Sequence, residues 1–321
     1  MRIAVATHAT TDPHVHRIGR WLLGSMQSLG AQWEPWMPPH PPQARVALQF
    51  ARPDQATAAE GKKNVLLWAK TTPGKLDPAD IVRMAGFDLI LGWSKDQVRQ
   101  ISEARAVTGR STPARIDPAV APPFMAVDPS RPLLKVPGKA LRFLWLGSTM
   151  PQDWQSVLTA WRDAFQATLY KDVTLSALGT PSDEDGEEKG HGITVVHRWP
   201  KLDAEWATLY GSHDVVIATQ TWGLGLGAPF VEAQAAGCLV VGPEAGTCAA
   251  ACSPGRAVLT ETPQDLPKAL KAVSEHWGSE DIEILRATGC QAARKRDYRV
   301  IAEGLYGLLQ DAAYKGMRAV S

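Results

Sequence analysis

Runs of apolar, strand-like residues alternate with amphipathic helical stretches along most of this chain. The runs that read as strands are 2–7, 64–68, 87–91, 142–146, 173–177, 193–196, 214–218 and 239–241. Helical periodicity is clearest over 15–29, 95–107 and 298–314. Such alternation is typical of parallel sheets covered by helices on both faces. The sequence therefore predicts an α/β chain of the doubly wound kind.

A proline-dense segment divides this alternation in two. Prolines crowd the residues between 117 and 140, where no periodic pattern is visible, as is typical of a linker. A chain of 321 residues can form two domains that each bury a core. We predict an N-terminal domain over 1–116, a linker over 117–140, a C-terminal domain over 141–296 and a closing helix within 297–321.

The most informative motif follows the strand at 214–218 and reads Trp-Gly-Leu-Gly-Leu-Gly-Ala-Pro-Phe-Val-Glu from Trp222 to Glu232. Gly225 and Gly227 let a ligand approach the backbone closely, and Pro229 favours a helix start. Free N–H groups at that start suit a phosphate, and Glu232, expected in the first helical turn, suits the paired hydroxyls of a ribose. The motif predicts a nucleotide-diphosphate site. The alternative is an ordinary buried strand–turn–helix connection.

Bulk properties exclude several other classes of protein. The net charge of +1 gives no overall attraction to nucleic acid or membrane. Four cysteines do not make a disulfide framework in a chain of this length, and no apolar run is long enough to span a bilayer. We therefore expect a cytoplasmic protein. No metal is expected, because Asp183-Glu-Asp185 lies in an acidic run typical of a solvated loop.

The sequence around the glycine motif resembles the GT-B glycosyltransferases of the "group 1" class. Residues 209–219 are similar to that family's Leu-Tyr-x-x-Ala-Asp-Val-x-Val-x-Pro-Ser. Residues 225–241 are similar to the end of its Glu-Gly-Phe-Gly-Leu-Pro-x-Leu-Glu-Ala-Met-Ala-x-Gly-x-Pro-Val-Val. The resemblance extends to 143–147 and 297–306. It implies two doubly wound Rossmann-like domains facing a central cleft, with the closing helix packed back on the N-terminal domain.

The resemblance also implies an activity. It predicts a glycosyltransferase that moves a sugar from a nucleotide-diphosphate donor to an acceptor hydroxyl without metal or other cofactor. The acceptor stays open between a glycan, a lipid-linked sugar, a small molecule and a hydroxymethylated DNA base. Basic residues at 294–296 and Arg299 would suit DNA, which the net charge does not favour. Alternatives are a nucleotide-sugar epimerase on the same scaffold and a non-catalytic nucleotide-sugar-binding protein.

Of the four donor-binding side chains in the family pattern, one is retained. It is Glu232, which the resemblance assigns to the ribose. Leu224 stands at the other glutamate position, Ser148 at the arginine position and Asp153 at the lysine position. We expect a rebuilt site, in which hydroxyls and turn amides bind the diphosphate and a neighbouring loop supplies charge and a ring for the base. Its candidates are Ser148, Thr149, Arg198, Trp199, Lys201, Trp222, Gly225, Leu226 and Gly227.

The segment after the first strand holds groups able to move protons. If the reaction inverts the anomeric centre, Asp12, His14 or His16 could act as the base that activates the acceptor. The alternative is that Asp12 caps a helix whose first residue is Pro13, with the histidines on a solvated turn. Neither histidine has a third ligand nearby in sequence that would make a metal site.

Overall fold

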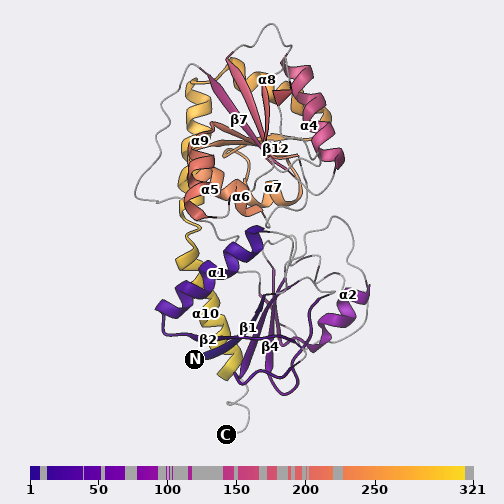
Figure 1. The fold of residues 1–321 in the computed structure, drawn as a ribbon, viewed down its shortest axis with the longest axis vertical. Coiled ribbons are helices and arrows are strands. Elements are labelled where there is room, and N and C mark those ends of the chain that lie inside the picture. The colour runs from indigo at the N-terminus through magenta and orange to yellow at the C-terminus, as the bar shows by residue number, and fades with distance from the viewer. Residues whose placement is uncertain are drawn as a thin grey trace. The chain divides into compact units, whose positions relative to one another are not determined.

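The structure is a computed structural model that describes residues 1–7, 13–38, 40–51, 55–68, 78–92, 99, 101, 103, 115–117, 140–147, 151–165, 172–178, 187–188, 192–196, 200, 202–219 and 227–314. The chain divides into two compact units, drawn in Figure 1. Unit 1 comprises residues 1–123 together with 296–321, and unit 2 comprises residues 124–295. Residues 118–139 of the expected linker lie outside the described residues.

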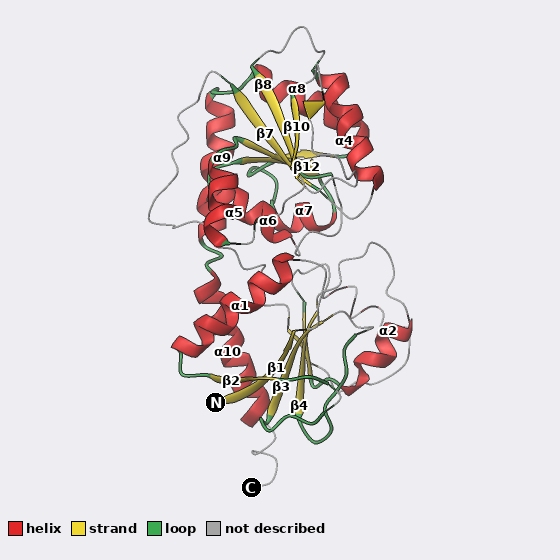
Figure 2. Cartoon of the chain, in the orientation of Figure 1, coloured by secondary structure: helices red, strands yellow, loops and turns green. Residues whose placement is uncertain are grey.

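Unit 1 contains a parallel sheet in the order β2-β1-β3-β4-β5-β6 (Figure 2). Its strands are β1 (Arg2–Thr7), β2 (Gln32–Pro35), β3 (Val46–Ala51), β4 (Lys63–Trp68), β5 (Leu89–Leu91) and β6 (Arg115–Asp117). Three of them, β2, β3 and β6, were not predicted. Every residue of β3 is buried, as expected for a central strand covered on both faces.

The helices of unit 1 are α1 (Pro13–Ser28), α2 (Pro78–Arg83), the short 3-10 helix η1 (Met84–Gly86) and α10 (Tyr298–Tyr314). Of the helix expected over 95–107, the described residues Arg99, Ile101 and Glu103 are helical. Helices α1 and α10 pack together, and the rings of Trp21 and Tyr298 stack with their centroids 5.7 Å apart. The end of the chain thus belongs to the same unit as its beginning.

Unit 2 contains a second sheet in the order β13-β12-β11-β7-β8-β10-β9, in which β9 alone of the described strands is antiparallel. Its strands are β7 (Leu141–Leu146), β8 (Val173–Leu178), β9 (Glu187–Glu188), β10 (Ile193–Val196), β11 (Val215–Ile217), β12 (Leu239–Pro243) and β13 (Val258–Thr260). The strand β9 falls in the acidic run that was expected to be a loop, because Glu187 and Glu188 extend the sheet at its edge.

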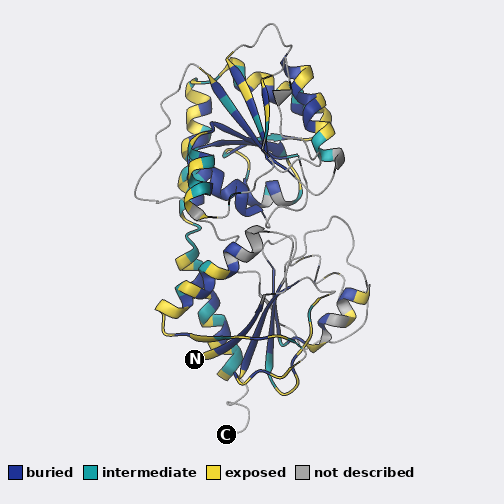
Figure 3. Ribbon diagram, viewed as in Figure 1, coloured by how far each residue is buried: buried dark blue, intermediate teal, exposed yellow. Residues whose placement is uncertain are grey.

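Alternate residues of each central strand of unit 2 face two separate cores. Figure 3 shows these central strands coloured as buried. Phe143 and Trp145 of β7 pack with α4 (Pro151–Ala164) and α8 (Leu266–Glu275), which follows the 3-10 helix η3 (Pro263–Asp265). Leu144 and Leu146 pack with α5 (Asp203–Gly211), α6 (Ala228–Ala235) and α7 (Gly246–Ala251). Helix α9 (Glu280–Arg294) contributes to both cores. Because helices cover both faces of a parallel sheet, the predicted doubly wound α/β class is confirmed.

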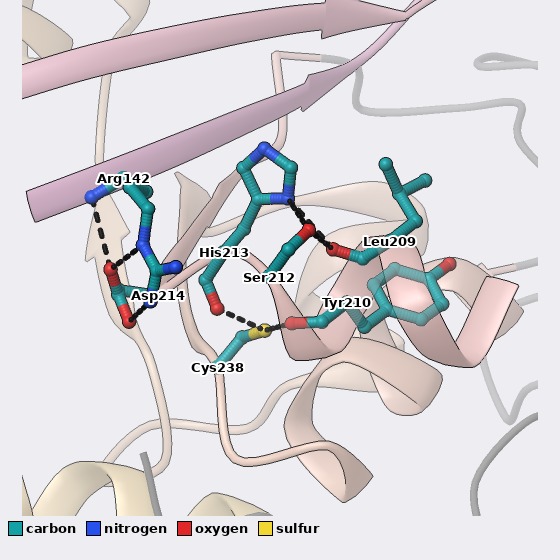
Figure 4. A network of polar contacts seen from close by, with 7 residues as sticks. All are labelled: Arg142, Leu209, Tyr210, Ser212, His213, Asp214 and Cys238. Atoms are coloured by element: carbon teal, nitrogen blue, oxygen red, sulfur yellow. Dashed lines mark hydrogen bonds and ion pairs between the residues drawn. The ribbon is translucent and has the colours of Figure 1, made fainter. Parts of the chain in front are cut away.

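An aspartate pins neighbouring strands together at the amino edge of each sheet. In unit 2, Asp214 accepts hydrogen bonds from the backbone N–H of Arg142 at 3.0 Å and from its guanidinium at 3.0 and 3.2 Å (Figure 4). In unit 1, Asp88 accepts from the backbone N–H of Asn64 at 2.8 Å and from the ammonium of Lys63 at 3.3 Å. Within unit 2, the Asp214 clamp lies at the opposite end of the strands from the predicted donor site.

Candidate functional site

The carboxyl ends of β7 and β11 mark the point where the sheet of unit 2 reverses its strand order. From β7 the chain adds β8 and β10 on one side, then returns to place β11 on the other side of β7. Open α/β sheets bind their ligands outside the carboxyl ends of strands at such a switch point. The segments that leave this point, 147–150 after β7 and 218–227 after β11, are the two that the sequence assigned to the donor diphosphate.

A hydrogen bond ties the two strands together immediately before these segments. The indole N–H of Trp145 donates to the hydroxyl of Thr219 at 3.0 Å, joining β7 to the residue that closely follows β11. The ring of Trp154, near the start of α4, lies 5.1 Å from that of Trp145. Trp145 of β7 therefore contacts both the residue that follows β11 and helix α4 next to the switch point. No local sequence pattern indicates this contact, because its partners lie 74 residues apart.

Gly227 begins α6 in a conformation that favours glycine. Its φ of 81° and ψ of 2° lie in the left-handed region, and it is the residue that precedes the helix. Pro229 follows within the first turn, where its missing N–H breaks no helical hydrogen bond. The remaining N–H groups of this turn have no partner within the helix, so they favour an anion.

Glu232 lies in the second turn of α6, and the expectation of a first-turn position was wrong. Because the left-handed Gly227 makes Ala228 the first helical residue, Glu232 is the fifth. Its side chain is fully buried, with an exposure of 0%. A buried carboxylate is costly unless hydrogen-bond donors surround it. Burial of this degree does not suit a surface charge.

The other predicted donor residues lie outside the described residues. They are Ser148, Thr149, Arg198, Trp199, Lys201, Trp222, Gly225 and Leu226, together with the departure at Leu224. Asp153 is described and lies half-buried in the first turn of α4, where an acidic side chain stabilises the helix start. A carboxylate therefore stands where the family pattern has a lysine, on the helix that follows β7.

The predicted base falls at the equivalent position of unit 1. Its sheet reverses strand order between β1 and β3, and the segment holding Asp12 follows β1 at that point. Asp12 lies outside the described residues. His14 and His16 fall in the first turn of α1, which begins at Pro13, and their side chains are outside the described part of the chain. The base assignment stays a prediction.

Among the described residues, no group of three or more His, Cys, Asp or Glu side chains is placed to hold a metal ion. No helix in the described ranges is both long and apolar enough to cross a membrane. The four cysteines are free thiols; Cys238, Cys248 and Cys252 are buried, as expected for small core side chains.

The sequence matches no protein-family model and no curated protein. The structure, in contrast, matches solved glycosyltransferases over almost its whole length. One from Rickettsia africae shares 10% identity over 97% of this chain and 98% of its own, with a TM-score of 0.68. The chain has the GT-B fold.

Two further structures agree with this fold. The α,α-trehalose 6-phosphate synthase of Burkholderia multivorans shares 12% identity over 98% of this chain and 99% of its own, with a TM-score of 0.68. Anabaena HepE in complex with UDP-glucose shares 13% identity over 97% of this chain and 99% of its own, with a TM-score of 0.66. The suspected GT-B resemblance is confirmed at the level of fold.

Proposed function

We propose that this GT-B chain is a glycosyltransferase that takes a sugar from a nucleoside-diphosphate donor held by unit 2. The observation that carries the proposal is the switch point between β7 and β11, which is followed by the helix that starts after Gly227 and carries the buried Glu232. The same fold binds UDP-glucose in Anabaena HepE. An anion site and a hydroxyl acceptor on one short helix fit the two halves of such a donor.

In the proposed reaction the main task of the protein is to stabilise charge on the departing diphosphate. The bond between the sugar and the diphosphate breaks while an acceptor hydroxyl forms the new bond and loses its proton. Amides at the start of α6 would face the growing negative charge. Glu232 would accept hydrogen bonds from the ribose and fix the nucleotide. The acceptor and a base at Asp12, His14 or His16 belong to the prediction from sequence.

The departures from the family pattern favour one alternative, a nucleotide-sugar-binding protein without turnover. Asp153 in place of a lysine puts a negative charge on the helix that follows β7, where the family has a positive one. Charge-assisted contacts to a phosphate are commonly worth about 1.5–3 kcal/mol each. Turnover therefore requires amides, hydroxyls or another loop to replace them. If the protein binds a nucleotide sugar but releases no nucleoside diphosphate from it when acceptors are present, this alternative is favoured.

Calorimetric titration with UDP, ADP, GDP and TDP, and then with their sugars, tests the proposal. We expect one nucleotide to bind, and Glu232→Gln to weaken it by about 10- to 100-fold, the effect of losing a hydrogen bond to a charged group. Glu261→Gln, at an exposed position, is the matched control and should bind as the wild type does. Thermal unfolding of each variant separates lost binding from lost structure. Failure of every nucleotide to bind the folded wild type would overturn the proposal.

Product analysis then separates transfer from epimerisation. A glycosyltransferase releases nucleoside diphosphate only as sugar appears on an acceptor, so release should depend on the acceptor supplied. A nucleotide-sugar epimerase would instead convert the donor alone into a nucleotide sugar of opposite configuration at one carbon, with no net release of nucleoside diphosphate. Acceptors to be screened are oligosaccharides, lipid-linked sugars, small phenols and alcohols, and hydroxymethylated DNA.

A further inference from the structure

Helix α9 packs along α6, the helix that follows Gly227 and carries Glu232, and a glycine lies in the seam between them. A Cβ added at Gly289 of α9 would stand 2.8 Å from the backbone carbonyl oxygen of Arg256 and 2.8 Å from the side-chain nitrogen of Gln234. Real Cβ atoms essentially never come this close to another heavy atom, so either the Arg256 backbone or the Gln234 side chain would have to move. A side chain at 289 would therefore push against the backbone of Arg256 and, through the Gln234 side chain, against α6.

Gln234 is the residue of α6 that lies at this seam, and it differs from the family pattern. It stands where the family pattern quoted above has methionine, and only 2% of its surface is exposed. Its amide donates to the carbonyl of Arg256 at 2.7 Å, which satisfies a polar group that would be costly to bury alone. The same two groups form the surface against which Gly289 lies. The glutamine, the carbonyl and the glycine thus form one packed unit.

A second contact holds the other end of α6. The buried guanidinium of Arg286, one turn earlier on α9, donates to the carbonyl of Gly237 at 3.2 Å, just beyond the last residue of α6. It also lies over the ring of Trp277, 5.0 Å from its centroid. A cation at the carbonyl end of a helix is favourable. Helix α9 therefore contacts α6 at two places, at Gln234 and just beyond the carboxyl terminus of α6. Both places are close in sequence to Glu232.

We propose that Gly289 is a positioning residue for the donor site, on the basis of the function proposed above. The absence of a side chain at 289 leaves the space that the Gln234 amide of α6 occupies, and this amide is buried and held by its hydrogen bond to Arg256. Because α6 is a short rigid helix, the position at which Gln234 is held also sets where the amides after Gly227 and the carboxylate of Glu232 stand. Gly289→Ala displaces α6 away from α9 and moves both donor-binding groups together, and small misplacements of such groups cost large factors in binding and rate.

The test compares three variants with the wild type by calorimetry, using whichever of UDP, ADP, GDP and TDP the wild type binds. Gly289→Ala should bind it at least about tenfold more weakly, a loss of ~1.4 kcal/mol. Gly304→Ala, at a helical glycine with open space around it, controls for the substitution itself and should bind normally. Arg142→Met breaks the clamp at the far edge of the sheet, so it lowers stability without touching the seam and should also bind normally.

Hydrogen exchange of residues 228–235 gives a readout that does not depend on nucleotide. It should speed up in Gly289→Ala and stay unchanged in Gly304→Ala. Adding Gln234→Ala to Gly289→Ala removes one of the two clashing atoms and should restore part of the affinity. Should Gly289→Ala fail to fold, Gln234→Met removes the contact with Arg256 without adding bulk, and it should weaken binding about threefold.

The possible failures are distinguishable. Absence of binding by the wild type would overturn the proposed function and this inference with it. Tight binding by the wild type and equally tight binding by Gly289→Ala would overturn the positioning role alone. A loss in Arg142→Met as large as that in Gly289→Ala would also overturn it, because affinity would then follow general stability.

Discussion

The two aspartate clamps offer a controlled measurement of what burial does to an ion pair. In Asp214→Asn the carboxylate loses one of its acceptor oxygens, and an amide donor turns toward groups that are themselves donors. Its partner Arg142 supplies a backbone N–H and two guanidinium N–H groups to the native carboxylate. Asp88→Asn makes the same change in the same local pattern, with Asn64 and Lys63 as partners.

The two substitutions should differ in cost because the two pairs differ in exposure. The side chain of Asp214 is 5% exposed and that of Arg142 is 40% exposed, whereas Asp88 and Lys63 are 35% and 42% exposed. A hydrogen bond to a charged group contributes about 1.5–3 kcal/mol to stability. Because the Arg142 side chain is partly exposed, water screens its charge and lowers the contribution of the Asp214 pair. We expect a loss of about 2–3 kcal/mol for Asp214→Asn and ~0.5–1 kcal/mol for Asp88→Asn.

Hydrogen exchange followed by mass spectrometry resolves the two effects, because the substitutions lie in different units. Peptides covering 141–146 and 215–217 report on unit 2, and those covering 63–68 and 89–91 report on unit 1. Each substitution should accelerate exchange only in its own unit. Equal losses, or a larger loss for Asp88→Asn, would refute the argument that burial decides the strength of these clamps.

Three further results are expected from particular contacts. Gly242→Ala should lower the free energy of unfolding of unit 2 by about 2 kcal/mol or more in urea titration, because its Cβ would meet the side chain of Ala218 at 2.6 Å. Gly307→Ala, in open space on α10, should raise stability by up to ~1 kcal/mol, which thermal melting would detect. Burial raises the pKa of Asp297, but hydrogen bonds from the Arg299 side chain and amide outweigh it and hold that pKa below its usual 3.8. The stabilisation from Asp297 is therefore present above that value and lost as pH falls through the lowered pKa, and carboxyl NMR titration should show the pKa rise in Arg299→Ala.

Local sequence patterns were sufficient for the elements that carry the site, and insufficient for the contacts that join them. The strands expected at 142–146 and 214–218 each consist of one charged residue and a continuous apolar run, and the glycines and proline before Phe230 mark the helix start. β3 was missed because Gln49 interrupts its apolar run. The structure buries that residue completely, and its side-chain oxygen accepts a hydrogen bond from the backbone N–H of Thr57 at 3.1 Å. A polar residue can occupy a central strand when a later loop supplies its partner.

Contacts between distant segments leave no periodic signal. The bond from Trp145 to Thr219 and the seam at Gly289 depend on which strand or helix lies beside which, and this follows from the strand order. The turn position of Glu232 was misjudged for a more local reason. Pro229 was taken to mark the helix start, which would place Glu232 in the first turn, whereas the helix begins one residue earlier, at Ala228, directly after the left-handed Gly227.

Asp153 offers a test of whether the rebuilt donor site lies where the strand order indicates. A half-buried carboxylate in the first turn of α4 stabilises that helix by about 0.3–1 kcal/mol. On the proposed function it also repels a diphosphate bound at the carboxyl ends of β7 and β11. Asp153→Asn should therefore make the protein less stable and its nucleotide affinity higher, by about fivefold for ~1 kcal/mol of repulsion removed.

Asp153→Lys, which restores the family's residue, should increase the affinity further, and added salt should shrink both gains. Opposite changes in stability and affinity cannot arise from general loosening of the fold, which would lower both. If nucleotide affinity is the same in the wild type, Asp153→Asn and Asp153→Lys, the diphosphate does not bind near residue 153. The start of α4 would then form no part of the donor site.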